Sequence, residues 1–159
     1  MLESIQPVAQ IYALNTRMYE QGVEGVDDQS LRRRPADGNN PLLWIAGHLA
    51  STRFGVCQIL GVNREIPWGK TFFRGASVDP AALPAMEGIR ESWREISGLL
   101  QQRLEAVSEA ELAAPAPKRF PIPDTTVRGA VTFLGWHEGY HIGQMSFVRR
   151  WLGLPGLAG

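Results

Sequence analysis

The sequence predicts an all-α protein, a four-helix bundle. Four stretches repeat apolar residues at spacings of three and four, the period of an amphipathic helix. No run of any length alternates apolar and polar residues, as a strand would. Segments rich in Gly, Pro, Asn and Asp separate the four stretches. Four long helices without strands are typical of bundles.

The first helix is predicted over residues 3–21, and Gly22 and Gly25 end it. Its apolar stripe contains Ile5, Val8, Ile11, Tyr12 and Met18. A connector follows over residues 27–40. Its three consecutive arginines, at positions 32–34, indicate a solvated surface.

The second helix is predicted to begin with Asn40 as its N-cap and Pro41 in the first helical position, and to run to residue 60. Its apolar set contains Trp44, Ile45, Leu49, Val56 and Ile59. His48 lies in the middle of that set. A long loop over residues 62–78 follows, and its aromatic residues predict either a plug on the domain or a lid over a site: Trp68, Phe72 and Phe73.

The third helix is predicted over residues 79–107, with an Asp-Pro start and Pro84 still in its first turns. It has the strongest amphipathic pattern, formed by Ile89, Trp93, Ile96, Leu100, Leu104 and Val107. A proline-rich connector is predicted over residues 112–124. The fourth helix is predicted over residues 126–152, where Gly153 and Pro155 stop it.

Length and composition limit the function classes. The 159 residues predict a single domain over positions 1–159, and 44% hydrophobic residues can build a core without disulfides. The 16 basic and 16 acidic side chains cancel, which argues against nucleic acid and anionic membranes as partners. One cysteine excludes a disulfide framework or a cysteine-based zinc ribbon. With no signal peptide or membrane span in the sequence, the cytoplasm is the expected compartment.

The three histidines of the chain carry the functional signal. His137 and His141, four residues apart on a helix, lie about 40° apart around the axis and about 6 Å along it, so both can reach one metal ion. They lie on the apolar stripe of their helix, as His48 does on its own. Unpartnered burial of three imidazoles would be costly. We therefore predict one shared metal site with open positions for water or substrate, the alternative being core histidines bonded to backbone carbonyls.

Residues 137–141 read His-Glu-Gly-Tyr-His and match the H-E-x-x-H signature of zinc peptidases. No His, Asp or Glu follows His141, so the downstream third ligand is missing, and a peptidase is disfavoured. Glu138 is either an ordinary ion-paired or surface residue, or it orients a ligand or holds a water. Gln144, one turn beyond His141, is a candidate to support a ligand or to contact substrate.

Two further features concern packing. Cys57 lies nine residues after His48, on the opposite side of the helix, which predicts a buried packing residue and not a fourth ligand. Gly135, Gly139 and Gly143 form a stripe on the back of the fourth helix. Such a stripe indicates close approach of another helix, either within the chain or from a second subunit.

Two runs of residues resemble the DinB family, also called DinB/YfiT-like metalloenzymes. They are Asn-Pro-Leu-Leu-Trp-Ile-Ala-Gly-His-Leu-Ala at 40–50 and His-Glu-Gly-Tyr-His-Ile-Gly-Gln at 137–144. The resemblance spans nearly the whole chain, including the tail at 149–155. It implies a four-helix bundle with one long crossover connection, often as a homodimer. It also implies a divalent metal, commonly nickel or zinc, on His48, His137 and His141.

Several relatives are thiol-dependent transferases that activate a low-molecular-weight thiol, such as bacillithiol or mycothiol, on the metal. The resemblance therefore implies thiol S-transferase-like chemistry on a small electrophile, and the metal would present the thiol as an anion. Arg53 and Arg149 are available to hold an anionic thiol cofactor. Two alternatives stay open: a hydrolase using a metal-bound water placed by Glu138 or Gln144, and a non-catalytic stress protein that binds metal or a small ligand. The sequence does not select among zinc, nickel, copper and iron.

Overall fold

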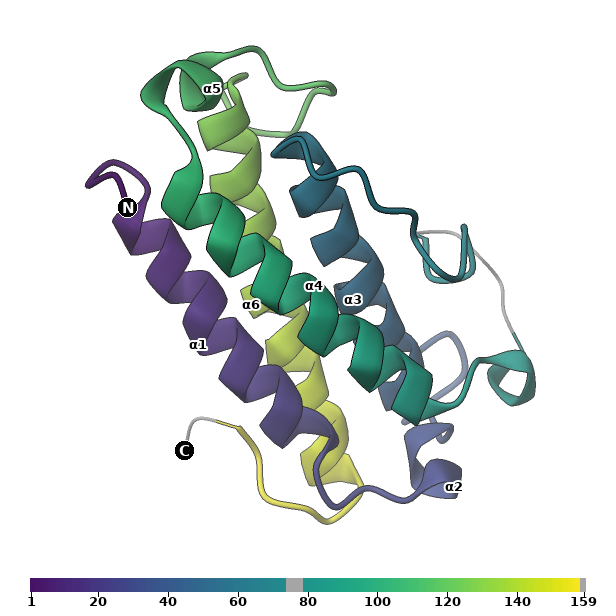
Figure 1. The fold of residues 1–159 in the computed structure, drawn as a ribbon. Helices are drawn as coiled ribbons and strands as arrows, with labels where there is room; N and C mark the ends of the chain where they lie inside the picture. Colours follow the sequence, from purple (N-terminus) through teal and green to yellow (C-terminus); the bar gives the residue numbers. More distant parts are fainter. Residues whose placement is uncertain (74–78, 158–159) are drawn as a thin grey trace.

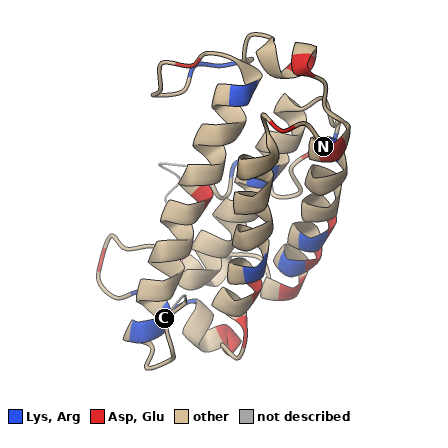
Figure 2. Ribbon diagram, turned by 90° about the vertical axis from the view of Figure 1, so that its left-hand side faces the viewer, with Lys and Arg blue, Asp and Glu red and all other residues tan. Residues whose placement is uncertain are grey.

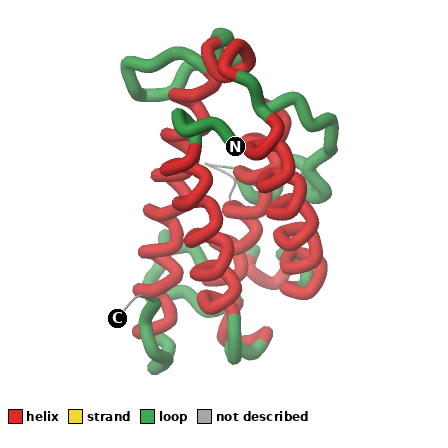
Figure 3. Tube along the Cα trace, turned by 60° about the vertical axis from the view of Figure 1, so that its left-hand side comes forward, coloured by secondary structure: helices red, strands yellow, loops and turns green. Residues whose placement is uncertain are grey.

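The computed structural model describes residues 1–73 and 79–157, and four long helices dominate it (Figures 1 and 3). They are α1 (Gln6–Val23), α3 (Leu42–Ile59), α4 (Met86–Ala106) and α6 (Val127–Trp151). Over the described ranges there is no strand, only an isolated bridge between Pro115 and Thr126. The predicted all-α four-helix bundle is confirmed.

Three short helices accompany the long ones, and a capping side chain begins each of them. They are α2 (Asp28–Leu31), η1 (Pro80–Ala82) and α5 (Glu109–Ala113). The Asp27 carboxylate accepts the backbone N–H of Ser30 at the start of α2. Ser108 and Glu111 form a reciprocal capping box that begins α5. The connectors predicted over 27–40 and 112–124 are therefore not entirely irregular.

Two predicted helix starts are wrong. Asp79 caps only the short η1, and α4 begins at Met86, because Leu83 is extended before Pro84 as residues preceding proline prefer. The N-cap of α3 is Pro41 and not Asn40, and no side-chain hydrogen bond caps this end.

The order of the helices around the bundle is α1, α6, α3, α4, and consecutive members of this ring pack against one another. Figure 1 shows α3 and α4 running in the same direction. The chain must therefore return along the length of the bundle between residues 60 and 85, which makes this segment the long crossover connection. Of the loop predicted over 62–78, the positions 74–78 lie outside the described residues.

The helix α3 is the centre of the core. Most of its 18 residues are buried, and apolar side chains cover all its sides. A helix that is hydrophobic all round has neighbours on every side. The fold therefore places His48, in the middle of α3, inside the bundle and next to α6. None of the described helices combines the length and apolarity needed to cross a membrane.

The glycine stripe of α6 has two kinds of environment. A Cβ at Gly135 would lie in ordinary contact, 3.5 Å from the ring of Tyr12 on α1. The same atom at Gly139 or Gly143 would meet nothing within 4 Å in the described part of the chain. Close packing within the chain therefore explains only the first of the three glycines.

Candidate metal centre

The three histidines meet where α3 faces α6. His48 projects from α3, and His137 and His141 project from one side of α6. One ring nitrogen from each residue lies within 4.8 Å of the other two, and the Nε2 atoms of His137 and His141 are 3.1 Å apart. His48 and His141 are each 9% exposed, so the cluster is partly closed off from water.

Hydrogen bonds fix the tautomers of two of these rings. The Nδ1 atom of His48 lies 2.7 Å from the carbonyl oxygen of Phe72, and Nδ1 of His141 lies 2.7 Å from Oε1 of Gln144. Both partners only accept, so both Nδ1 atoms carry a proton and donate. In the neutral rings Nε2 then carries the lone pair. This is the arrangement found in metal-binding histidines, whose other nitrogen donates to a carbonyl or a similar group.

His137 completes the cluster from α6, one turn before His141. Its Nε2 faces the lone pair on Nε2 of His141, while its Nδ1 is buried without a partner. A neutral His137 with its proton on Nε2 would donate it to Nε2 of His141. With the proton on Nδ1, both Nε2 atoms would offer lone pairs, and one cation could bind both.

The surroundings keep the rings neutral and able to bind. Burial lowers the pKa of His137 to about 4, and repulsion from His48 adds to the shift. Burial, followed by repulsion from His48 and His137, lowers the pKa of His141 to about 4. Burial also lowers the pKa of His48, against the hydrogen bond to Phe72. At neutral pH, protons do not compete for these nitrogens.

The spacing fits a first-row divalent ion. Nitrogens about 2.0–2.1 Å from one ion lie about 2.9 Å apart at a right angle and about 3.4 Å apart in a tetrahedron. The 3.1 Å between the two Nε2 atoms on α6 falls between these values. Three imidazoles suit zinc, nickel, copper or iron.

The family assignment agrees with this geometry. The sequence model of the DinB superfamily matches residues 11–145, which include all three histidines. The chain belongs to the DinB superfamily. No curated protein matches its sequence.

Two solved structures share the fold of this DinB protein. A DinB-like protein from Bacillus cereus has a TM-score of 0.72 at 18% identity, covering 98% of this chain and 97% of its own. YfiT from Bacillus subtilis has a TM-score of 0.64 at 18% identity, covering 97% and 91%. YfiT is described as a probable metal-dependent hydrolase with an unusual four-helix bundle topology. At this identity the likeness shows the fold alone.

The buried carboxylate of Glu138 is held in a salt bridge and not beside the metal centre. Arg53 donates to it twice, from Nε at 2.9 Å and from Nη2 at 2.6 Å, and Asn15 adds a third bond of 3.3 Å. Both charged side chains are completely buried. Of the two roles that the sequence left open for Glu138, these contacts show the ion-paired one. Within the described residues, none of its hydrogen bonds goes to a histidine.

Gln144 does contact the cluster. Its Oε1 accepts the Nδ1–H of His141, and its Nε2 donates to the hydroxyl of Tyr140 at 3.1 Å. The side chain is therefore oriented from both ends. It fixes the His141 ring in the tautomer that presents Nε2 to the centre of the cluster.

The residues considered for binding a thiol cofactor are engaged elsewhere. Arg53 is buried in the pair with Glu138. Arg149 donates to the carbonyls of Gly22, Glu24 and Pro155, and so closes the C-terminal end of α1. Cys57 is fully buried, and burial raises the pKa of its thiol to about 12, in line with the predicted packing role.

The sequence did not predict that the backbone of Phe72 binds His48. The plug interpretation is right for this residue, which is completely buried, whereas the neighbouring Phe73 is 41% exposed. The ring of Phe72 rests on Gly47, where a Cβ would lie only 2.3 Å from it. The crossover connection therefore approaches α3 closely enough for its backbone to bind His48. The glycine directly before the histidine is the signal in the sequence.

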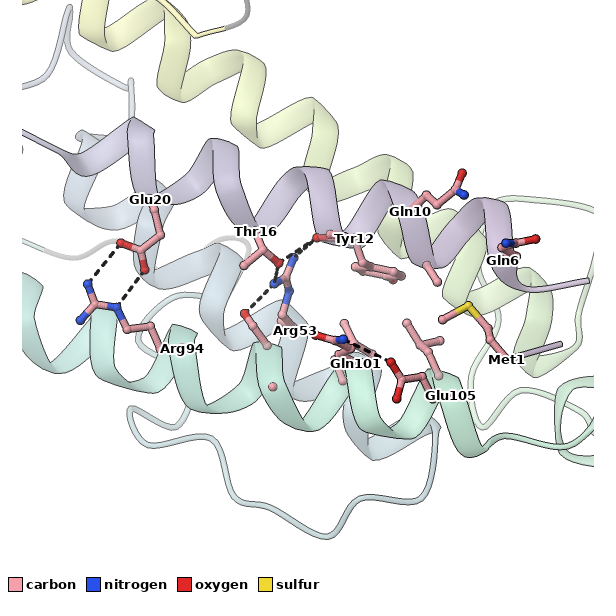
Figure 4. Close-up of a pocket in the computed structure, with 16 residues that line it drawn as sticks. Met1, Gln6, Gln10, Tyr12, Thr16, Glu20, Arg53, Arg94, Gln101 and Glu105 are labelled. Carbon is pink, nitrogen blue, oxygen red and sulfur yellow. Dashed lines mark hydrogen bonds and ion pairs between the residues drawn. The ribbon is translucent and has the colours of Figure 1, made fainter. Parts of the chain in front are cut away.

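A separate cavity of about 800 Å³ lies between α1 and α4, away from the histidines (Figure 4). Arg53 stands at its inner wall, where Nη1 donates to the hydroxyls of Thr16, at 2.7 Å, and Ser97, at 2.6 Å. Its five N–H groups are thereby used within the protein. The cavity shares no residue with the metal centre.

Proposed function

We propose that this DinB protein is a divalent-metal-dependent enzyme whose metal, zinc or nickel, binds to His48, His137 and His141. The observation that carries the proposal is the pair of hydrogen bonds from Nδ1 of His48 and His141, which turn both Nε2 lone pairs toward one point. Three neutral protein ligands leave coordination positions open, which is typical of catalytic sites and not of closed structural ones.

The reaction we propose is a thiol S-transferase-like addition to a small electrophile. When bound, the ion would lower the pKa of a thiol and so favour the nucleophilic anion at neutral pH. The chain contributes the orientation of the rings, through Phe72 and Gln144, and a pocket in which the imidazoles stay neutral. Neither Arg53 nor Arg149 is free to bind the cofactor. We expect the protein to act in the cytoplasm, where small thiols stay reduced.

A metal-dependent hydrolase is the second candidate, and the description of YfiT favours it. In this chain the residue that could position a water is Gln144 and not Glu138, whose oxygens are bound to Arg53. A non-catalytic role in binding metal or a small ligand is the third candidate.

Elemental mass spectrometry tests the metal site. Protein purified without a His-tag should contain about one zinc or nickel per chain, and His48→Ala and His137→Ala should each abolish it. Thr132→Ala, an exposed position on the far side of α6, is the matched control. Folding is checked by circular dichroism. Failure of the wild type to bind zinc or nickel on reconstitution would refute the proposal.

Turnover separates the candidates. With a panel of small electrophiles, a transferase requires added thiol, whereas a hydrolase is active in thiol-free buffer. Absence of turnover together with tight binding of a small ligand would favour the non-catalytic role.

We also propose that the chain forms a homodimer through the α1 side of α6. There Gly139 leaves open space on the side of α6 that follows Gly135 toward α1, and Ile11 and Leu14 of α1 are 44% and 45% exposed. Apolar residues beside helical glycines allow a second helix to approach closely.

A further inference from the structure

A row of aromatic rings leads away from the histidines along the outside of the bundle. We call Phe120, Phe133, Trp136 and Tyr140 the aromatic strip. Successive ring centroids lie 5.5 Å apart from Phe120 to Phe133, 5.6 Å from Phe133 to Trp136 and 6.1 Å from Trp136 to Tyr140. All three distances fall in the range of interacting aromatic pairs.

The strip borders the metal centre directly. The ring of Phe133 is 6.3 Å from that of His137, and the ring of Tyr140 is 5.1 Å from that of His141. Tyr140 also shares Gln144 with His141, through its hydroxyl. A molecule lying on Phe133 or Tyr140 would therefore be next to His137 or His141.

Two members of the strip are exposed to a degree that packing within the chain does not explain. Trp136 is 62% exposed and Tyr140 is 54% exposed. Phe120 and Phe133 are half-buried against the core, so the exposed part of the strip is the pair Trp136 and Tyr140. Scattered exposed apolar residues are ordinary, but adjacent exposed aromatic rings are typical of a binding surface. Tyrosine and tryptophan are suited to this task because they offer flat apolar area with little loss of side-chain entropy.

The far end of the strip is positively charged. Nζ of Lys118 lies 5.3 Å from the ring centroid of Phe120, and no carboxylate pairs with it within the described residues. The acidic groups at this end of the bundle are engaged: Glu109 with Arg128, Glu111 with Arg103, and Asp124 with Thr126. Figure 2 shows basic residues in the loop between α5 and α6 at this end.

We propose that the aromatic strip is the substrate-binding surface of the metal centre, and that its ligand is a small planar aromatic carboxylate. The proposal rests on the proposed function for the direction of the ligand. The ring system would stack on Trp136 and Phe133, the carboxylate would face Lys118, and the reactive carbon would lie toward His137. Unlike Arg53 and Arg149, Lys118 is thus available to a substrate of this site.

Isothermal titration calorimetry with 2-naphthoate tests the proposal, because it needs no turnover. The uncharged 2-naphthamide serves as the paired probe. Trp136→Ala should weaken binding of both probes by about tenfold, because it removes the stacking surface. Lys118→Ala should weaken binding of 2-naphthoate several-fold and leave 2-naphthamide unchanged. Phe147→Ala is the matched control, since this residue is 60% exposed on the same helix but lies outside the strip.

Two results would overturn the proposal. One is the absence of saturable 2-naphthoate binding to the wild type, and the other is an equal Kd for the wild type and Trp136→Ala. If Trp136→Ala changes the mass by light scattering but not the Kd, the strip is covered by a second copy of the chain, and the proposal is wrong.

Metal content, measured on the same samples, keeps the two proposals separate. Bound metal without probe binding refutes the aromatic strip alone. Probe binding that depends on Trp136 in a protein unable to take up zinc or nickel refutes the metal-dependent function and supports the strip as a ligand surface.

Discussion

Replacing Gly47 with alanine should weaken metal binding without touching a ligand. The new Cβ would lie 2.3 Å from two carbons of the Phe72 ring, more than 1 Å closer than the ordinary contact of 3.4–4 Å. Phe72 is completely buried, so its ring cannot turn into free space. The backbone of the crossover connection must shift instead. The 2.7 Å hydrogen bond from His48 to the Phe72 carbonyl would then lengthen or break.

The size of the effect follows from what that hydrogen bond does. Losing a group that orients a metal-bound histidine typically weakens metal affinity by about 10- to 100-fold, which corresponds to about 1.4–2.7 kcal/mol. We expect the Kd of Gly47→Ala for zinc to rise by this factor in competition with a chelating dye at pH 7. Circular dichroism should show unchanged helicity.

Gly55→Ala is the matched control, because it lies on the same helix and a Cβ there would meet nothing within 4 Å. It should leave the Kd unchanged and stabilise the helix by up to about 1 kcal/mol. A smaller side chain at the crossover, in Gly47→Ala/Phe72→Leu, should restore part of the affinity. If Gly47→Ala binds zinc as tightly as Gly55→Ala does, the contact between His48 and Phe72 does not set metal affinity.

Three further predictions concern the ion pair, acid sensitivity and assembly. Glu138→Leu leaves the Arg53 cation buried without its partner and should lower the free energy of unfolding in urea by about 3–5 kcal/mol. The double variant Arg53→Met/Glu138→Leu should regain most of that stability. A loss below about 1 kcal/mol in Glu138→Leu would contradict a buried ion pair. In metal-free protein the folded-state pKa of His137 is about 4, below the ordinary value near 6.5. Between pH 6.5 and pH 4 the unfolded state therefore binds more protons than the folded state. The Tm of the wild type should therefore fall as the pH drops through this window, and the Tm of His137→Leu should fall less. Equal dependence of Tm on pH in the two proteins would contradict this prediction. Gly139→Leu should convert a dimer into a folded monomer by light scattering, and an unchanged mass counts against the proposed interface.

Local patterns predicted what depends on neighbours along the chain. The four long helices follow from apolar residues at spacings of three and four, and the common direction of His137 and His141 follows from the helical period alone. The wrong start of the third helix has the same kind of cause. The short η1 and the extended Leu83 before Pro84 delay the start of α4 to Met86. The spacing of apolar residues contains no information about these two features.

Contacts between distant segments were beyond such patterns. Phe72 approaches His48 across 24 positions, through a crossover whose path depends on α3 and α4 being parallel. Arg53 and Glu138 are 85 positions apart. Periodicity places each residue on a face of its helix, but it does not say which residue of another helix it will meet.

The pairing of α3 with α6 shows how the register decides the chemistry of the H-E-x-x-H run. The two helices are antiparallel, so moving forward from His48 to Arg53 on α3 corresponds to moving back from His141 to Glu138 on α6. The histidine of α3 therefore meets the histidines of α6, and its arginine meets the glutamate. In a peptidase the glutamate must stand free beside the metal to activate a water. Here an arginine five residues after His48 binds both carboxylate oxygens, so the same motif supplies two metal ligands and one half of a core ion pair.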